Sequence, residues 1–287
     1  MDIIGKRKIW YIISLVVIGI GLLFLIFSGL NFGIDFTGGT ILQFQFDESV
    51  TNEEAREILE EKGIKEGNKI QQSSEDGVEG IMIRTISLNS DEISEIEEAF
   101  KEKFSSADLV QTRMVGPLIG QELRTMALLA LLVASIAIVI YISIRFEFRF
   151  AIVAIIALLH DVLITIGIFA ILGREINTPF VAALLTIIGY SINDTIVIFD
   201  RIRENMKLMA NSSFMELANQ AVVDTLPRSI NTSITTLIAI LSIYFFGGAS
   251  IKVFMLALFI GMFAGTYSSI FIASPLLVTW KNKIGVS

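Results

Sequence analysis

The sequence contains no cysteine and only one histidine among its 287 residues. Without cysteine, a disulfide framework, a thiolate metal site and a cysteine nucleophile are excluded. One histidine also argues against metal catalysis, so no cofactor is expected. Acidic residues outnumber basic ones, giving a net charge of −7. Most of the excess acid lies in residues 47–102, which predicts one water-exposed segment and argues against nucleic acid as a partner.

Long apolar runs are abundant. Hydrophobic residues make up 53% of the chain, and the mean hydropathy is +0.70. A bilayer core about 30 Å thick requires about 20 helical residues. Runs of this length predict six transmembrane helices, at about 9–30, 125–144, 150–172, 180–199, 227–246 and 253–274. The first run is too long for a signal-peptide core and lacks a small-residue cleavage site, so we expect it to remain as a helix.

Basic residues in the short loops indicate the orientation. On one side of the predicted membrane lie Lys6, Arg7, Lys8, Arg145, Arg149, Arg201, Arg203, Lys207, Arg228, Lys281 and Lys283. The positive-inside rule places this side, and both termini, in the cytoplasm. We therefore expect residues 1–30 to form the N-terminus and first helix, 31–124 an extracytoplasmic domain, and 125–287 the other five helices with a cytoplasmic loop at 200–226.

The outward segment has the pattern of a small α+β domain. We expect strands at about 40–46, 68–74, 80–85 and 107–115, and helices at 52–62 and 91–104. This βαββαβ order is typical of a ferredoxin-like fold. Thr51 and Glu54 predict a capping box at the first of these helices. The expected fold class is a polytopic α-helical membrane protein with a ferredoxin-like α+β domain between helices 1 and 2.

A second capping box is predicted in the cytoplasmic loop. Ser213 and Glu216 have the required spacing and open a helix that we expect to run to about Thr225 at the membrane surface. Pro227 then fits the first turn of a separate fifth transmembrane helix.

Asp194 lies inside the fourth apolar run, where a carboxylate costs about 2.5–3.5 kcal/mol on insertion scales. Tyr190 precedes it by about one turn and Asn193 is adjacent, so we expect a polar stripe that faces the bundle. Arg228 lies at a matching depth in the next span and is the expected salt-bridge partner. The alternatives are that Asp194 only packs helices and that Arg228 anchors its helix by snorkelling to the headgroups.

Other polar residues interrupt the apolar runs. Asp161 follows His160 deep in the third span, where a carboxyl suits a proton carrier or, alternatively, a structural hydrogen bond between helices. Thr232 belongs to a hydroxyl face of the fifth span that either lines a water path or packs helices. Gly261 and Gly265 predict close helix packing of the sixth span.

Five motifs, in chain order, resemble those of the SecF family in the resistance-nodulation-division superfamily. They occupy residues 32–39 after the first helix, 115–123 before the second, 160–161 in the third, 189–195 with 199–205 at the fourth, and 228–233 entering the fifth. The resemblance covers nearly the whole chain. It implies that the motif residues near the outer domain couple that domain to the helices; these are Asp35, Gly38, Gly39, Gly116, Gly120 and Glu122.

The resemblance implies a protein-transport subunit of the bacterial inner membrane, not an enzyme. Its implied partners are SecD in a separate chain, the SecYEG channel, SecA indirectly and the translocating preprotein, with YajC and YidC as further candidates. Members use the proton-motive force to promote export after the SecA-driven stage. Asp194 and Arg228 match the charged pair that the family uses in proton conduction.

The matching depths of Asp194 and Arg228 motivate the hypothesis that Asp194 binds a proton arriving from outside and loosens from Arg228. Helix movement is then relayed through residues 35–39 to the outer domain. Two rival functions stay open: a proton-coupled exporter of small molecules or lipids from the same superfamily, and a passive assembly scaffold in which the polar residues only hold helices together.

Overall fold

The structure is a computed structural model that describes residues 1–64, 69–75, 78–209 and 211–283. Within these residues six helices are long and apolar enough to cross a membrane, which confirms the predicted number and order of spans. Five of them are α1 (Arg7–Ser28), α5 (Pro117–Arg145), α6 (Phe148–Ile171), α7 (Thr178–Leu208) and α8 (Phe214–Phe246). The sixth span, Ile251–Lys281, consists of α9 (Ala249–Ser268), the π-helical turn η1 (Ser269–Ala273) and α10 (Ser274–Lys283).

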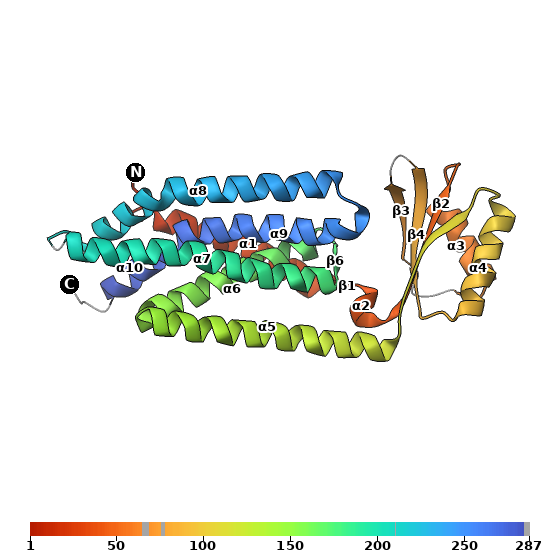
Figure 1. Ribbon diagram of the computed structural model, residues 1–287, viewed down its shortest axis with the longest axis horizontal. Helices are drawn as coiled ribbons and strands as arrows, with labels where there is room; N and C mark the ends of the chain where they lie inside the picture. Colours follow the sequence, from red (N-terminus) through yellow and green to blue (C-terminus); the bar gives the residue numbers. More distant parts are fainter. Residues whose placement is uncertain (65–68, 76–77, 210, 284–287) are drawn as a thin grey trace. The chain divides into compact units, whose positions relative to one another are not determined.

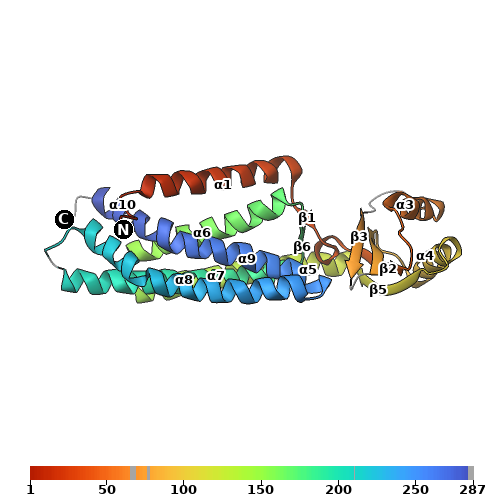
Figure 2. The same cartoon turned by 90° about the horizontal axis from the view of Figure 1, so that it is seen from above.

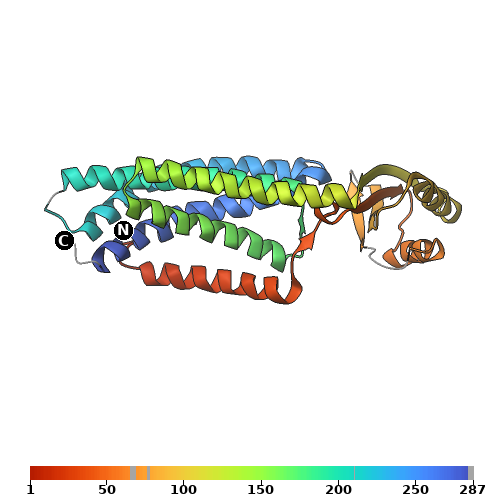
Figure 3. The ribbon, with the colours of Figure 1, turned by 90° about the horizontal axis from the view of Figure 1, so that it is seen from below.

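The chain divides into two compact units (Figure 1). The helical unit comprises Met1–Asn31 and Leu129–Ser287, and the mixed unit comprises Phe32–Leu128. In the helical unit α5 turns back into α6 at residues 146–147, so that these two helices run antiparallel (Figure 3).

Glycines bring the helices of the helical unit together. A Cβ atom added to Gly21 of α1 would lie 2.8 Å from the Cα of Gly167 in α6, so these two backbones are in contact at this point. Figure 2 shows α1 running beside α6. A side chain at Gly261 of α9 would overlap Ile187 of α7, and one at Gly265 would lie 2.9 Å from Ser191 Cβ. The predicted packing role of the last two glycines is therefore confirmed, and their partner is α7.

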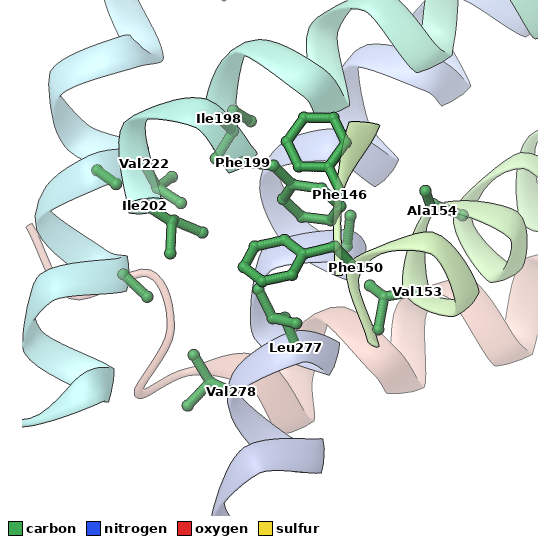
Figure 4. Close-up of a cluster of buried hydrophobic side chains, with 14 of the residues drawn as sticks. Phe146, Phe150, Val153, Ala154, Ile198, Phe199, Ile202, Val222, Leu277 and Val278 are labelled. Atoms are coloured by element: carbon green, nitrogen blue, oxygen red, sulfur yellow. The ribbon is translucent and has the colours of Figure 1, made fainter. Parts of the chain in front are cut away.

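A hydrophobic core of the helical unit contains aromatic and aliphatic side chains mainly from α5, α6, α7, α8, η1 and α10 (Figure 4). Phe199 meets Phe150 edge to face at a ring separation of 5.0 Å. Val222 and Leu277 pack in the same cluster. This core lies between the ends of these helices, on the side of the helical unit that contains the N-terminus, and packs the helices against one another.

The prediction of a separate surface helix before Pro227 is wrong. The capping box of Ser213 and Glu216 is present, but it opens one continuous helix, α8, in which Pro227 is an interior residue. Proline lacks an N–H and removes a hydrogen bond from the helix. The helix continues because residues 214–226 bury Leu217 and Val222 in the core. Residues 200–208 likewise belong to α7, so residues 200–226 contain mostly helix.

The mixed unit contains a four-stranded antiparallel sheet and two longer helices. Its elements are α2 (Ile34–Thr37), β2 (Gly39–Phe46), α3 (Asn52–Glu61), β3 (Lys69–Glu75), β4 (Val78–Thr85), α4 (Ser90–Lys103) and β5 (Asp108–Val115). The strands lie in the order β3-β4-β2-β5. The expected start of the second strand at residue 68 lies outside the described residues. The two-residue strands β1 (Asn31–Phe32) and β6 (Glu175–Ile176) are not part of this sheet.

Strand β2 contributes Leu42, Phe44 and Phe46 to the core of the mixed unit. The neighbouring Ile41 and Gln43 are also buried, so β2 is covered over most of its length. Phe44 stacks on Phe100 of α4 with 4.4 Å between ring centroids. The predicted capping box of Thr51 is present at α3, and Asn89 forms a further one at α4.

Candidate functional site

Asp194 lies on α7 where this helix faces α8. Its Oδ1 accepts a hydrogen bond of 2.7 Å from Ser229 Oγ. Its Oδ2 is buried and has no hydrogen-bond partner within the described part of the chain. A carboxylate prefers several donors when it leaves water. The site therefore has an unused acceptor beside a buried serine.

The expected ion pair between Asp194 and Arg228 is absent from the described structure. Successive residues of a helix point about 100° apart, so only one of two neighbours on α8 can face Asp194. That residue is Ser229, which is fully buried, while Arg228 is exposed. Arg228 lines a cleft of about 390 Å³ between α7 and α8, which Arg201 and Asp224 also line.

Arg201 and Asp224 join α7 to α8 at this cleft. The guanidinium of Arg201 donates to Asp224 Oδ2 at 2.6 Å and to Glu204 at 2.7 Å. Asp200 accepts from Arg145 and from Arg203 at 3.2 and 3.4 Å. The charges at the end of α7 thus neutralise one another and also tie this helix to α5 and α8.

Asp161 is the centre of a second, fully buried cluster. It is 1% exposed, and its Oδ2 accepts hydrogen bonds from Ser191 at 2.5 Å and Ser268 at 2.8 Å. Its Oδ1 lies 2.8 Å from Nδ1 of His160, whose Nε2 lies 3.0 Å from Ser14 Oγ. These partners come from α1, α6, α7 and α9. One carboxyl therefore has hydrogen-bonding partners from four helices, directly or through His160.

The two acids belong to separate networks within the described residues. No hydrogen bond there joins the Asp161 cluster to Asp194. Beside Asp194, the hydroxyl of Tyr190 lies 3.4 Å from Ser233 Oγ, which lies 2.6 Å from Thr266 Oγ1. Ser233 is one turn beyond Ser229 on α8. The α7–α8 junction thus has a short hydroxyl row, reaching α9.

Two other predicted site residues face outward. Asn193 and Thr232 are exposed, and the backbone carbonyl of Thr232 accepts bonds from Thr235 and Thr236. The predicted hydroxyl face of α8 is therefore divided. Ser229 and Ser233 point into the bundle, whereas Thr232 lies on the outer surface with Arg228.

In the mixed unit two of the sequence motifs meet. Gly38 and Gly39 have φ of +73° and +134°, which L side chains rarely adopt. A Cβ at Gly39 would lie 2.6 Å from the carbonyl oxygen of Thr85, and one at Gly120 would lie 2.9 Å from the amide nitrogen of Gly38. The glycine turn thus fits tightly between β4 and the start of α5.

The remaining residues of these motifs differ in their placement. Asp35 is buried and its Oδ1 accepts a 3.2 Å bond from Arg113 of β5. A Cβ added to Gly116 would meet no atom within 4 Å beyond its chain neighbours, and Glu122 is exposed on α5. The structure therefore brings Asp35, Gly38, Gly39 and Gly120 together and leaves Gly116 and Glu122 at the edge.

Sequence reasoning missed two hydroxyls of the Asp161 cluster. Ser14 is a serine well inside the first apolar run, and Ser268 follows the Gly261 and Gly265 repeat. Both are buried. A lone hydroxyl in an apolar span is a usable signal for a buried hydrogen bond, but the sequence does not identify its partner.

Two family models match the chain. Residues 95–283 match the model of the protein export membrane protein SecD/SecF, C-terminal. Residues 23–50 match the SecD/SecF GG motif, which includes the Gly38 and Gly39 turn. The chain belongs to the SecF family. It is thus a multi-pass membrane protein with six candidate spans among its described residues.

Named relatives agree with this assignment. The protein translocase subunit SecF of Thermobaculum terrenum is 44% identical over 302 aligned positions, which cover 99% of this chain and 95% of that protein. The protein translocase subunit SecDF of Thermus thermophilus is 42% identical over 89% of this chain, but this alignment covers 35% of SecDF. The name of that relative joins SecD and SecF, and this chain spans about a third of that relative's length.

Two solved structures are similar to the chain. The crystal structure of SecDF, a translocon-associated membrane protein from Thermus thermophilus, matches 98% of this chain with a TM-score of 0.91 and 38% identity. SecDF in a super-membrane-facing form matches 99% with a TM-score of 0.73. In both cases the chain covers 39% of the solved chain.

Proposed function

We propose that the chain is a membrane subunit of the Sec preprotein translocation machinery. In this role it works with a separate SecD chain beside the SecYEG channel and uses the proton-motive force to promote export after the SecA-driven stage. YajC and YidC are further candidate partners. The main support is the match to protein translocase subunits named SecF over nearly the whole chain. The fusion in SecDF supports the choice of SecD as partner.

The proposed topology places both termini in the cytoplasm and residues 31–124 outside the inner membrane. The distribution of Lys and Arg over the short loops supports this orientation. We propose a ferredoxin-like fold for the outer domain, supported by the βαββαβ order of its elements and by the strand order β3-β4-β2-β5.

The outer surface of α7 and α8 is the proposed SecD contact. Asn193, Arg228 and Thr232 are exposed polar side chains on these two spanning helices. Polar side chains on a spanning helix are stabilised by hydrogen bonds to another helix rather than by lipid. A second membrane subunit on this face would supply such partners.

Asp194 is the proposed proton-binding group. Its half-buried carboxyl has one oxygen bonded to Ser229 and one buried oxygen with no partner in the described chain. Proton binding at the second oxygen neutralises a charge that is costly in the membrane. The attraction to Arg228 in the neighbouring cleft then weakens, which favours a shift of α8 relative to α7.

The energy available per proton limits this mechanism. One charge crossing the membrane supplies about 2.3 kcal/mol per 100 mV. That is enough for a modest shift between two helix arrangements, but not for a complete one. The shift is proposed to reach residues 35–39 through α1 and α5, the two helices that connect directly to the mixed unit. Asp161 is proposed as a second group in the proton pathway.

The decisive experiment replaces Asp194 by Asn in a complex with SecD and follows proton-gradient-dependent release of a translocating preprotein. Asp200→Asn is the matched control, because Asp200 lies on the same helix but in an exposed ion-pair cluster. We expect Asp194→Asn to assemble with SecD and to lose the response to the gradient. Undiminished gradient-dependent release would exclude the proton role, and joint loss of assembly and release would favour a scaffold.

A further inference from the structure

A second cleft, of about 370 Å³, lies between the start of α6, the end of α7, the start of α8 and α10. These parts of the helices lie at the end of the helical unit that contains the N-terminus (Figure 1). Phe150 and Leu277 line its apolar side, and both belong to the packed cluster of Figure 4. Its wall is therefore part of the folded core.

Two cations line this cleft without an acidic partner in the described chain. Arg149 is half-buried and forms no ion pair or hydrogen bond through its side chain there. Lys281, also half-buried, has its Nζ 4.0 Å from the ring centroid of Phe214. Glu147 is the one carboxylate among the described lining residues, and it is exposed. The cleft therefore has an excess of positive charge.

Other basic residues at the same end of the bundle, unlike those in the cleft, form ion pairs with acidic residues. Arg145 and Arg203 share Asp200, and Arg201 pairs with Asp224 and Glu204. In the cleft, the positive end of the α6 helix dipole adds to the unpaired cations, because α6 begins at Phe148 and its N-cap side chain makes no capping bond. Such an arrangement favours the binding of an anion.

We propose that this cleft binds the headgroup of an anionic phospholipid. The lipid phosphate binds between the Arg149 guanidinium and the Lys281 ammonium, as expected for basic pockets between spanning helices. Phe148, 71% exposed in the lining of the cleft, and Ile144, 82% exposed near the end of α5, offer apolar surface to the acyl chains. The cleft lies at the ends of apolar spanning helices, where lipid headgroups are expected, and this position favours a lipid over a soluble phosphate compound.

The test is a lipid titration of the purified full-length chain in non-ionic detergent, followed by native mass spectrometry. Phosphatidylglycerol is compared with phosphatidylcholine of the same acyl chains, and glycerol 3-phosphate serves as a soluble phosphate. We expect phosphatidylglycerol to bind more tightly than phosphatidylcholine and glycerol 3-phosphate not to compete. The double variant Arg149→Gln/Lys281→Gln should weaken phosphatidylglycerol binding by about fivefold per cation and leave phosphatidylcholine unchanged.

Matched variants separate the cleft from general surface charge. Lys6→Gln/Lys8→Gln removes two exposed cations outside the cleft and should leave binding unchanged. Glu147→Gln removes the opposing charge and should tighten phosphatidylglycerol binding, a gain that a folding defect does not produce. Equal phosphatidylglycerol affinity in the wild-type chain and the Arg149/Lys281 double variant would overturn the proposal, as would displacement of the lipid by glycerol 3-phosphate.

Discussion

Ser229 Oγ donates a 2.7 Å hydrogen bond to Asp194 Oδ1, and this bond joins α8 to α7 in the middle of the two helices. The neighbouring Arg228 points away into a cleft and to the surface. A neutral hydroxyl, not a guanidinium, is thus the direct partner of the intramembrane carboxyl in this arrangement. Because a serine hydroxyl can donate or accept, it suits a carboxyl that changes its protonation state.

Ser229→Ala is expected to destabilise the α7–α8 junction. The change leaves both carboxyl oxygens of Asp194 without a donor in the described chain, and an unsatisfied buried acceptor costs about 1–3 kcal/mol. The thermal unfolding midpoint of the purified chain measures this effect. Ser242→Ala is the control, since Ser242 on the same helix is exposed and donates only to its own backbone, at Ile238. Equal midpoints for the two variants would contradict the prediction.

Asp161→Asn is expected to preserve the fold and remove the proton-dependent step. The amide oxygen can still accept from Ser191 and Ser268, and the amide nitrogen can donate to Nδ1 of His160 if that ring takes its other tautomer. An amide does not take up a proton at physiological pH. Gradient-dependent preprotein release, assayed with SecD present, should fall while the unfolding midpoint stays close to wild type. Wild-type release by this variant would assign Asp161 a purely structural role.

Gly39→Ala should destabilise the mixed unit. A methyl group would lie 2.6 Å from the Thr85 carbonyl oxygen, and the φ of +134° is itself strained for alanine, by about 1–3 kcal/mol. Gly116→Ala is the matched control, because no atom lies within 4 Å of its added Cβ. Hydrogen exchange of β2 and β4 in the full chain should rise in the first variant only. A comparable rise in Gly116→Ala would show that the close contact is not the cause.

The capping box of α3 should give that helix a pH dependence. The pKa of Glu54 is lowered, chiefly by the backbone N–H of Thr51 and then by its hydroxyl. A group with a lowered folded-state pKa stabilises the fold fully above its unfolded-state pKa, and this contribution is lost as the pH falls through the folded-state value. Exchange of α3 amides, corrected for intrinsic rates, should therefore increase in that acidic range.

Glu54→Gln should abolish this pH dependence, whereas Glu60→Gln, outside the capping box on the same helix, should retain it. Thr51→Ala should accelerate exchange at neutral pH as well, since loss of an N-cap costs about 0.5–2 kcal/mol. An identical pH profile for Glu54→Gln and the wild-type chain would disprove the assigned cause.

Local patterns predicted the elements of this protein well. The apolar runs gave six spans in the correct order, and the spacing of Thr51 with Glu54 and of Ser213 with Glu216 located two helix starts. Pro227 was misjudged because its local preference for a first turn was overridden by burial of residues 214–226 in the core. Propensity is a weak signal when tertiary packing opposes it.

The sequence alone determined that the chain crosses a membrane, that Asp161 and Asp194 interrupt the apolar spans, and that Gly38 and Gly39 form a special turn, because each follows from composition or local backbone chemistry. The partners of these groups depended on tertiary structure. Whether Ser229 or Arg228 faces Asp194 depends on a rotation of about 100° of α8, which is set by the packing of the whole helix. The four helices that meet at Asp161 are distant in sequence, so only the fold brings Ser14, Ser191 and Ser268 to one carboxyl.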